Sequence, residues 1–172
     1  GTPTQAIAVT VTNVTYAPVI TSAAAVSVAE NQTSAITVTS TDVDGGAPSY
    51  SITGGADQTL FSINASTGVL TFNAAPNFES PTDAGANNVY DVTVQVSDGN
   101  GGTATQAIAV TVTNVNESPV ITSAASVSVA ENQTSAITVT STDVDGGAPS
   151  YSIVGGADQA LFSINSSTGV LS

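Results

Sequence analysis

An internal repeat constrains this chain more than any other feature of its sequence. The segment VSVAENQTSAITVTSTDVDGGAPSYSI at 26–52 recurs without change at 127–153, an offset of 127 − 26 = 101 residues. The segment QAIAVTVTNV follows the same offset, because it begins at residues 5 and 106. A repeat of about a hundred residues is too long for one coil of a solenoid, but it matches the length of a β-sandwich domain. The sequence therefore predicts tandem sandwich repeats of about 101 residues.

Seven segments of the complete repeat alternate apolar and polar residues with a period of two, which is typical of strands with one buried face. Clusters of Gly, Pro, Asn and Asp separate these segments and indicate turns. No segment shows a helical period. The fold class predicted is therefore an all-β, antiparallel, seven-stranded sandwich. Its expected inward residues are Val26 and Val28, Ile36 and Val38, Tyr50 and Ile52, Phe61 and Ile63, Leu70 and Phe72, Tyr90 with Val92, Val94 and Val96, and Ile108, Val110 and Val112.

The frame of the repeat predicts three parts. Residues 1–16 match 102–117 and are interpreted as the last strand of a preceding repeat; 17–116 form one complete repeat; 117–172 begin a second. That second part has no counterpart of 72–101, and natural sheets avoid open edges of this kind. Two explanations remain open. In the first, the chain, which contains no Met, is a segment of a longer tandem array. In the second, residues 1–16 of a neighbouring chain complete the second part by strand donation.

The charge of the chain points to a metal. Thirteen Asp and Glu residues accompany no Lys, Arg or His, so the formal net charge is −13 and the compensating charge must come from outside. Two carboxylates 5 Å apart in water repel by only ~0.8 kcal/mol, so scattered acids require no partner. Solubility alone is a sufficient explanation for Asp57, Asp83, Asp91 and Asp158. The remaining acids gather in clusters beside strand-like segments, and clustered carboxylates without internal cations suggest bound cations.

Composition excludes several classes of function. Without His, Cys or Lys the chain lacks a general base, an activated thiol and a catalytic amine, and it has no phosphate-binding glycine loop before a helix. Carboxylate pairs could cleave glycosides, but the chain has no Trp to form a sugar platform. Without Lys or Arg it cannot neutralise phosphates, and it has no run of about 20 apolar residues. We therefore predict no enzyme activity, no nucleic-acid partner and no membrane insertion.

The order of motifs in the chain resembles the cadherin repeat, in the bacterial cadherin-like form of large surface adhesins and extracellular fibres. Each motif is weak alone, but the set recurs in the family's order at a fixed period. The motifs are V-S-V-A-E-N, T-D-V-D-G-G, Y-S-I-x-G-G-A-D, F-S-I-N-x-S-T-G-V-L, P-N-F-E, Y-D-V-T-V-Q-V-S-D-G and T-V-T-N-V-N-E-S-P. The resemblance spans the whole chain and implies a cadherin/immunoglobulin-like sandwich on the cell surface.

The resemblance also implies calcium sites at the junctions between repeats. The family's ligand motifs match these residues here: Glu30 after the first strand, Asn77 and Glu79 in N-F-E, Asn114, Asn116 and Glu117 in the linker, and Asp143 and Asp145 from the D-x-D of the next repeat. By the same match, Asp42, Asp44 and Asp98 face the junction before the complete repeat. The alternatives are ordinary turn residues for the Asn positions and a solvated linker acid for Glu117.

The chemistry of these residues fits calcium independently of the resemblance. Calcium takes six to eight oxygens at ~2.3 to 2.6 Å from carboxylates, amides and backbone carbonyls, whereas magnesium retains its waters and requires strict octahedra. The earlier linker, N-V-T-Y-A at 13–17, has Thr15 and Tyr16 where the later one has Asn116 and Glu117. That junction is expected to bind calcium weakly or not at all.

The function predicted is a calcium-rigidified structural spacer for cell adhesion, in an extracellular adhesin or fibre whose partners are further copies of the repeat. Near-identical repeats favour spacing over recognition, because binding sites usually diversify. Two alternatives remain: an adhesive module that binds a surface glycan or protein, and a filament subunit that assembles by donation of residues 1–16.

Overall fold

A computed structural model describes residues 1–12 and 14–172, and it divides the chain into a unit of residues 1–114 and a unit of residues 115–172. The two units are described separately. Asn13, which belongs to the predicted 1–16 strand and to the predicted 13–17 linker, lies outside the described residues.

The larger sheet of the first unit has four strands, in the order β2 (Ala25–Ala29), β9 (Thr103–Thr113), β8 (Val89–Ser97) and β5 (Ser49–Gly54). Strand β8 is antiparallel to both of its neighbours, but β2 and β9 run parallel, with Val26 opposite Val110. The prediction of a purely antiparallel sandwich was wrong at this pair. The first and last strands of the unit are distant in sequence, so no turn between them could indicate their direction.

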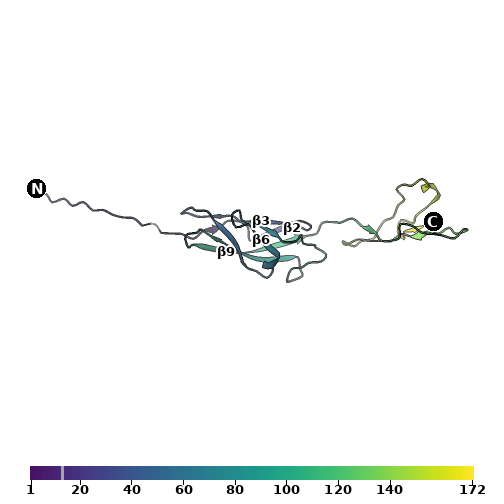
Figure 1. Cartoon of the computed structure of the whole chain (residues 1–172), viewed down its shortest axis with the longest axis horizontal. Helices are drawn as coiled ribbons and strands as arrows, with labels where there is room; N and C mark the ends of the chain where they lie inside the picture. The colour runs from purple at the N-terminus through teal and green to yellow at the C-terminus, as the bar shows by residue number, and fades with distance from the viewer. Residues whose placement is uncertain (13) are drawn as a thin grey trace. The chain divides into compact units, whose positions relative to one another are not determined.

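The smaller sheet has three antiparallel strands, β3 (Ser34–Thr37), β7 (Val69–Phe72) and β6 (Phe61–Ile63). A separate ribbon pairs β1 (Val19–Ile20) with β4 (Ser40–Thr41), and the short 3-10 helix η1 (Gln58–Leu60) precedes β6. All seven expected strands are therefore present, with two more of two residues each. Figure 1 shows β2 and β9 of the larger sheet and β3 and β6 of the smaller one.

One core lies between the two sheets. Tyr90, Val92, Val94 and Val96 of β8 are all at most 1% exposed, as the period-two pattern predicted. Leu70 from β7 is fully buried opposite them. Each such side chain contributes roughly 1.5 to 3 kcal/mol by leaving water, so this burial fixes the register of β8 against β9.

Three aromatic rings complete the core at one end of the sheets. The ring centroids of Phe61 and Phe72 are 4.5 Å apart, and Tyr90 meets Phe72 edge to face at 5.1 Å. The Tyr90 hydroxyl accepts a hydrogen bond from the backbone N–H of Thr82 at 3.3 Å. This contact places the loop between β7 and β8, residues 73–88, over the aromatic end of the core.

A turn at Asn64 shows how local sequence determines local structure. The Asn64 side-chain oxygen accepts the N–H groups of Ser66 and Thr67, each at 3.0 Å. Gly68 follows with φ +71, and a Cβ there would collide with the Val38 carbonyl. The second unit repeats the turn at Asn165, with Gly169 at φ +69.

The second unit contains four two-residue strands and one short 3-10 helix, η2 (Gln159–Leu161). Strand β10 (Val120–Ile121) pairs with β12 (Ser141–Thr142), and β11 (Ile137–Thr138) pairs with β13 (Val170–Leu171). Leu161 is 78% exposed and Phe162 is 45% exposed. Their counterparts in the first unit, Leu60 and Phe61, belong to or contact the core.

Candidate metal centre

Glu30 is a buried acid at the end of β2. Only 3% of its surface is exposed, and its backbone N–H donates to the Thr113 carbonyl at the end of β9. Its Oε2 accepts the backbone N–H of Phe78 at 2.8 Å. Strand pairing and a loop contact thus hold this carboxylate where the complete repeat ends. Burial of a carboxylate is costly unless hydrogen bonds or cations compensate the charge, and the chain has no Lys, Arg or His.

Glu79 lies beside Glu30, in the loop 73–88. One carboxylate oxygen from each residue lies within 4.8 Å of the other. Glu79 Oε1 also accepts a hydrogen bond from the Asn114 side-chain amide at 2.9 Å, which links the loop to the end of β9. The structure therefore brings together three of the predicted ligand residues, Glu30, Glu79 and Asn114. Asn77 is two residues from Glu79, and its side-chain oxygen accepts the Ser80 N–H at 3.0 Å.

The donor set of this end fits calcium. Two oxygens that share one calcium ion lie at most about 5 Å apart, given metal–oxygen distances of ~2.3 to 2.6 Å. The Glu30 and Glu79 oxygens meet that condition. Carboxylate and amide oxygens are the ligands that calcium prefers, and none of these residues offers the nitrogen or sulfur that zinc favours.

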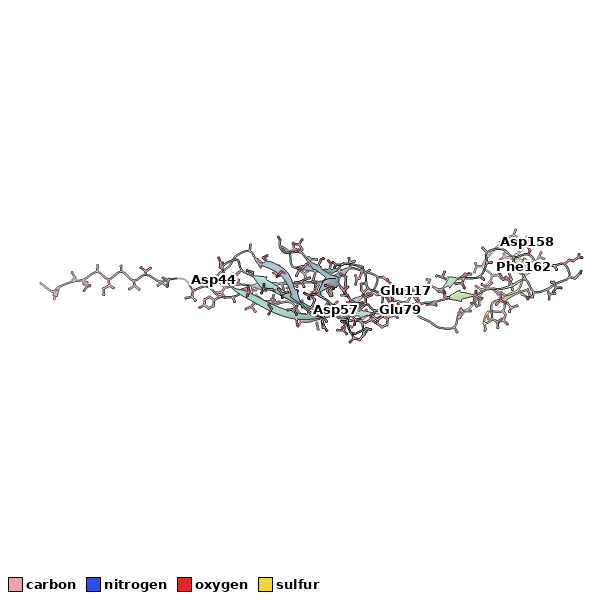
Figure 2. The ribbon with its side chains drawn as sticks, turned by 60° about the horizontal axis from the view of Figure 1, so that its bottom comes forward. Asp44, Asp57, Glu79, Glu117, Asp158 and Phe162 are labelled. Atoms are coloured by element: carbon pink, nitrogen blue, oxygen red, sulfur yellow. The ribbon has the colours of Figure 1, made fainter. Side chains whose placement is uncertain are left out.

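The opposite end of the first unit carries the second predicted group, Asp42, Asp44 and Asp98. Figure 2 shows Asp44 at one end of this unit and Glu79 at the other. Asp42 Oδ1 accepts the Asp44 N–H at 2.8 Å, while its Oδ2 is buried without a hydrogen-bond partner among residues 1–12 and 14–172. Asp98 is 7% exposed, and its Oδ1 accepts the N–H groups of Asn100 and Gly102. The buried Asp42 Oδ2 is therefore able to coordinate a cation at this end.

The two linkers use their backbones in the same way. The Tyr16 N–H donates to Asp44 Oδ2 at 2.6 Å, and in the second unit the Glu117 N–H donates to Asp145 Oδ2 at 2.6 Å. The offset of 101 relates both pairs, so the same backbone contact occurs at both positions while the side chains of residues 16 and 117 differ. Tyr16 supplies a phenol where Glu117 supplies a carboxylate.

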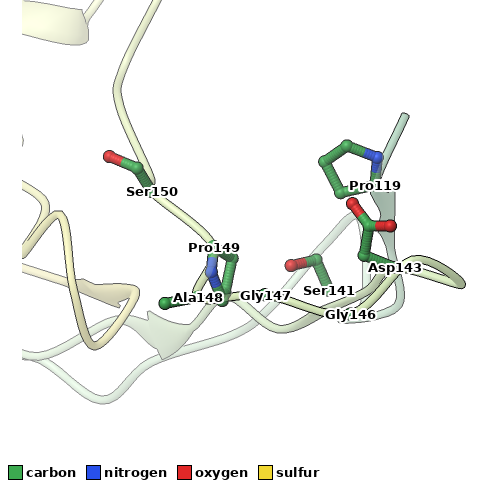
Figure 3. Close-up of a pocket in the computed structure, with 8 residues that line it drawn as sticks. All are labelled: Pro119, Ser141, Asp143, Gly146, Gly147, Ala148, Pro149 and Ser150. Carbon is green, nitrogen blue, oxygen red and sulfur yellow. The ribbon is translucent and has the colours of Figure 1, made fainter. Parts of the chain in front are cut away.

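In the second unit, Asp143 and Asp145 adopt the geometry of Asp42 and Asp44. Asp143 Oδ1 accepts the Asp145 N–H at 3.0 Å, and the Asn116 side-chain amide donates to the Glu117 carbonyl at 2.7 Å. Asp143 also lines a hollow of about 230 Å³. Figure 3 shows Asp143 and Pro119 at one end of this hollow and Ser150 at the other.

Sequence reasoning missed the surroundings of two acids. Asp57 and Asp83, interpreted as surface acids, are only 3% and 6% exposed. Backbone N–H groups satisfy both carboxylates, from Ala84 and Asp91 for Asp57 and from Asn87 and Asn88 for Asp83. The sequence around Asp57 does not signal its burial, because its donors lie 27 residues away in the loop and 34 residues away in β8. Asp91 and Asp158 are exposed, as expected.

A family model with the description "Bacterial Ig domain" matches residues 15–111. The chain belongs to the bacterial Ig domain family. The match covers β1 to β8 and all but the last two residues of β9, so the predicted all-β sandwich is confirmed for this bacterial Ig domain. A search of curated protein sequences found no match.

Solved structures similar to this bacterial Ig domain are cadherin fragments, which confirms the predicted cadherin-like fold. Human protocadherin-24 EC1-2 superposes with a TM-score of 0.59 and 21% identity, over 91% of this chain and 78% of that one. Mouse cadherin-23 EC22-24 superposes with a TM-score of 0.53 and 21% identity, over 90% of this chain and 53% of that one. Drosophila N-cadherin EC1-4 superposes with a TM-score of 0.56 and 19% identity, over 91% of this chain and 40% of that one. The chain thus spans about half or less of the last two structures.

None of the helices in the described part of the chain combines the length and the apolar character needed to cross a membrane.

Proposed function

We propose that this chain is a structural spacer of an extracellular adhesin or fibre, stiffened by calcium at the junctions between repeats. The observation that carries the proposal is the pair formed by Glu30 and Glu79. Two carboxylates lie within 4.8 Å at the end of a sandwich, one of them buried, in a chain without Lys, Arg or His. An imported cation is the simplest source of the missing positive charge.

The ligands proposed for the later junction are Glu30, Asn77, Glu79 and Asn114 from the first unit, with Asn116, Glu117, Asp143 and Asp145 from the second. Glu117 is three residues beyond Asn114, so its Cα lies at most about 11 Å away along the chain. Bound calcium would neutralise the carboxylates of both repeats. Without calcium, those carboxylates repel one another across the linker, and the angle between the two repeats is not fixed.

The comparisons support an extracellular place for such a spacer. One similar structure, at a TM-score of 0.52 and 25% identity, is described as "Protocadherin Gamma B2 extracellular cadherin domains 3-6". The superposition includes 90% of this chain and 42% of the protocadherin chain. Tandem arrangement in that relative agrees with the repeat of 101 residues found here.

Small-angle X-ray scattering with and without EDTA tests the proposal. We expect chelation to change the maximum dimension of the particle while the far-UV circular dichroism spectrum stays the same. Glu117→Gln should reduce the calcium response, whereas Glu131→Gln, an equal charge change at an exposed acid, should leave it intact. A scattering profile that is identical in calcium and EDTA would contradict the proposal.

Self-association is a second candidate, favoured by one specific observation. Residues 5–12 repeat the sequence of 106–113 in β9, yet they form no strand, and Val9 is 82% exposed. Segment 126–130 differs from β2 only at its first residue and also forms no strand. Residues 5–12 of one copy could pair with 126–130 of another, as β9 pairs with β2. Sedimentation velocity should then show concentration-dependent oligomers that Val9→Asp abolishes; a monomer at all concentrations contradicts this candidate.

A further inference from the structure

A buried aspartate that is not a predicted ligand connects the Glu79 loop to the larger sheet. Asp57 lies just before η1, with 3% of its surface exposed. Its Oδ1 accepts the N–H of Ala84, in loop 73–88, at 2.7 Å. Its Oδ2 accepts the N–H of Asp91, in β8, at 2.8 Å, and its own N–H donates to the Asp91 carbonyl at 3.0 Å. One side chain therefore fixes the distance between the loop and β8.

A second buried aspartate shapes the end of the same loop. Asp83 accepts the N–H groups of Asn87 and Asn88, each at 3.0 Å, through its two different oxygens. These bonds hold Asn88 in a left-handed conformation with φ 62. From there the Asn88 amide donates to the Phe78 carbonyl at 2.9 Å. Asp83 thus acts on the backbone that lies between Asn77 and Glu79.

The contacts continue from Phe78 to the candidate metal centre. The Phe78 N–H donates to Glu30 Oε2, and the next residue is Glu79. Hydrogen bonds and the loop backbone together therefore connect Asp57 and Asp83, through Asn88 and Phe78, to the Glu30 carboxylate, and Glu79 follows Phe78 directly in the chain. Bonds from N–H groups to a carboxylate are shorter and stronger than bonds between neutral groups. Residues 73–88 form a loop of 16 residues without helix or strand, so these hydrogen bonds are needed to hold its backbone in one conformation.

We propose that Asp57 and Asp83 are positioning residues of the metal centre, which hold loop 73–88 so that the Glu79 carboxylate stays beside Glu30 before any metal arrives. This inference rests on the proposed function, because it takes Glu79 to be a calcium ligand. Its structural part, the placement of the loop, does not depend on calcium and can be measured in EDTA.

The test compares Asp57→Asn and Asp83→Asn with Asp158→Asn. Asn keeps the shape of Asp but replaces one acceptor oxygen by an NH₂ group, so one backbone N–H loses its partner. Asp158 is the counterpart of Asp57 at the offset of 101, and it is exposed (Figure 2). We expect the calcium Kd from isothermal titration calorimetry to rise about tenfold or more in the first two variants and to stay unchanged in the third.

Hydrogen exchange in EDTA supplies the readout that a general loss of stability would not give. The Phe78 and Ala84 amides should exchange faster in Asp57→Asn, while the Val94 and Val110 amides of the sheet keep their wild-type rates. Asn88→Gly, which keeps the left-handed conformation but deletes the bond to Phe78, provides a second variant if Asp57→Asn fails to fold.

The outcomes separate this inference from the proposed function. Unchanged loop exchange and unchanged Kd in every variant would overturn the inference, as would equal acceleration of loop and sheet amides. If the wild-type chain binds no calcium but the loop amides still respond, the proposed function fails and only the loop placement survives.

Discussion

Replacing Glu79 by Gln should change the stability of the first unit in opposite directions with and without calcium. The variant keeps the oxygen that accepts the Asn114 amide, and it removes one charge from a pair whose oxygens lie within 4.8 Å. At that separation the repulsion is about 3.5 kcal/mol for an effective dielectric constant of about 20, and about 0.9 kcal/mol for bulk water. Glu30 is buried and Glu79 is half-buried. We therefore expect Glu79→Gln to stabilise the calcium-free protein by about 1 to 2 kcal/mol.

Calcium should reverse this order. A ligand present at a hundred times its Kd stabilises the wild-type protein by about 2.7 kcal/mol, and a variant that lacks one anionic ligand loses most of that gain. Urea unfolding followed by far-UV circular dichroism, in EDTA and in millimolar calcium, gives both differences. The slopes of the unfolding free energy against urea should agree between variants, so that midpoints can be compared.

Two results would refute this reasoning. If Glu79→Gln destabilises the protein equally in EDTA and in calcium, the carboxylate serves packing or hydrogen bonding rather than a metal. If it stabilises the protein equally in both, the pair repels but binds no ion. Glu131→Gln, at an exposed acid of the second unit, is the control and should change neither midpoint by more than about 0.5 kcal/mol.

Two further predictions concern the core and the earlier linker. Leu70→Ala should lower the unfolding free energy by about 3 to 4 kcal/mol, because Leu70 is fully buried; its counterpart Leu171, which is only partly buried, should cost clearly less in the same urea assay. Tyr16→Glu should give the earlier linker the acid found at Glu117 and increase calcium affinity at Asp42 and Asp44 several-fold, measured by competition with a chelating dye. Tyr16→Phe, which adds no charge, should leave that affinity unchanged.

The strands and turns of the first unit could be predicted because their signals are local. The period-two pattern of Tyr90 to Val96 places four residues in the core, and the Asn64 turn forms from residues 64 to 68 alone. The parallel pairing of β2 with β9 could not be predicted in this way. It depends on where the whole chain returns after six intervening strands, β3 to β8, and no short segment encodes that direction.

The acids of the candidate metal centre could be named as a set from the sequence, and their role as ligands stays a prediction, but their individual surroundings could not be predicted. Glu30 and Glu79 are 49 residues apart, and only the folded loop shows that their oxygens approach within 4.8 Å. Asp57 and Asp158 both occur in the sequence G-G-A-D-Q, yet Asp57 is buried and Asp158 is exposed. Burial of a polar group depends on backbone donors supplied by distant segments, and the sequence around that group does not report them.

Glu30 and Glu131 also differ in burial although their local sequences are identical. Both occur in the sequence V-S-V-A-E-N, but Glu30 is 3% exposed, whereas Glu131 is exposed. The difference follows from β9, because the Glu30 N–H donates to Thr113 and the preceding strand pairs along its length with β9. Loop 73–88 then supplies the Phe78 N–H. The buried position of Glu30 therefore requires a complete sandwich with its loop in place, and the six-residue motif alone is not sufficient to form it.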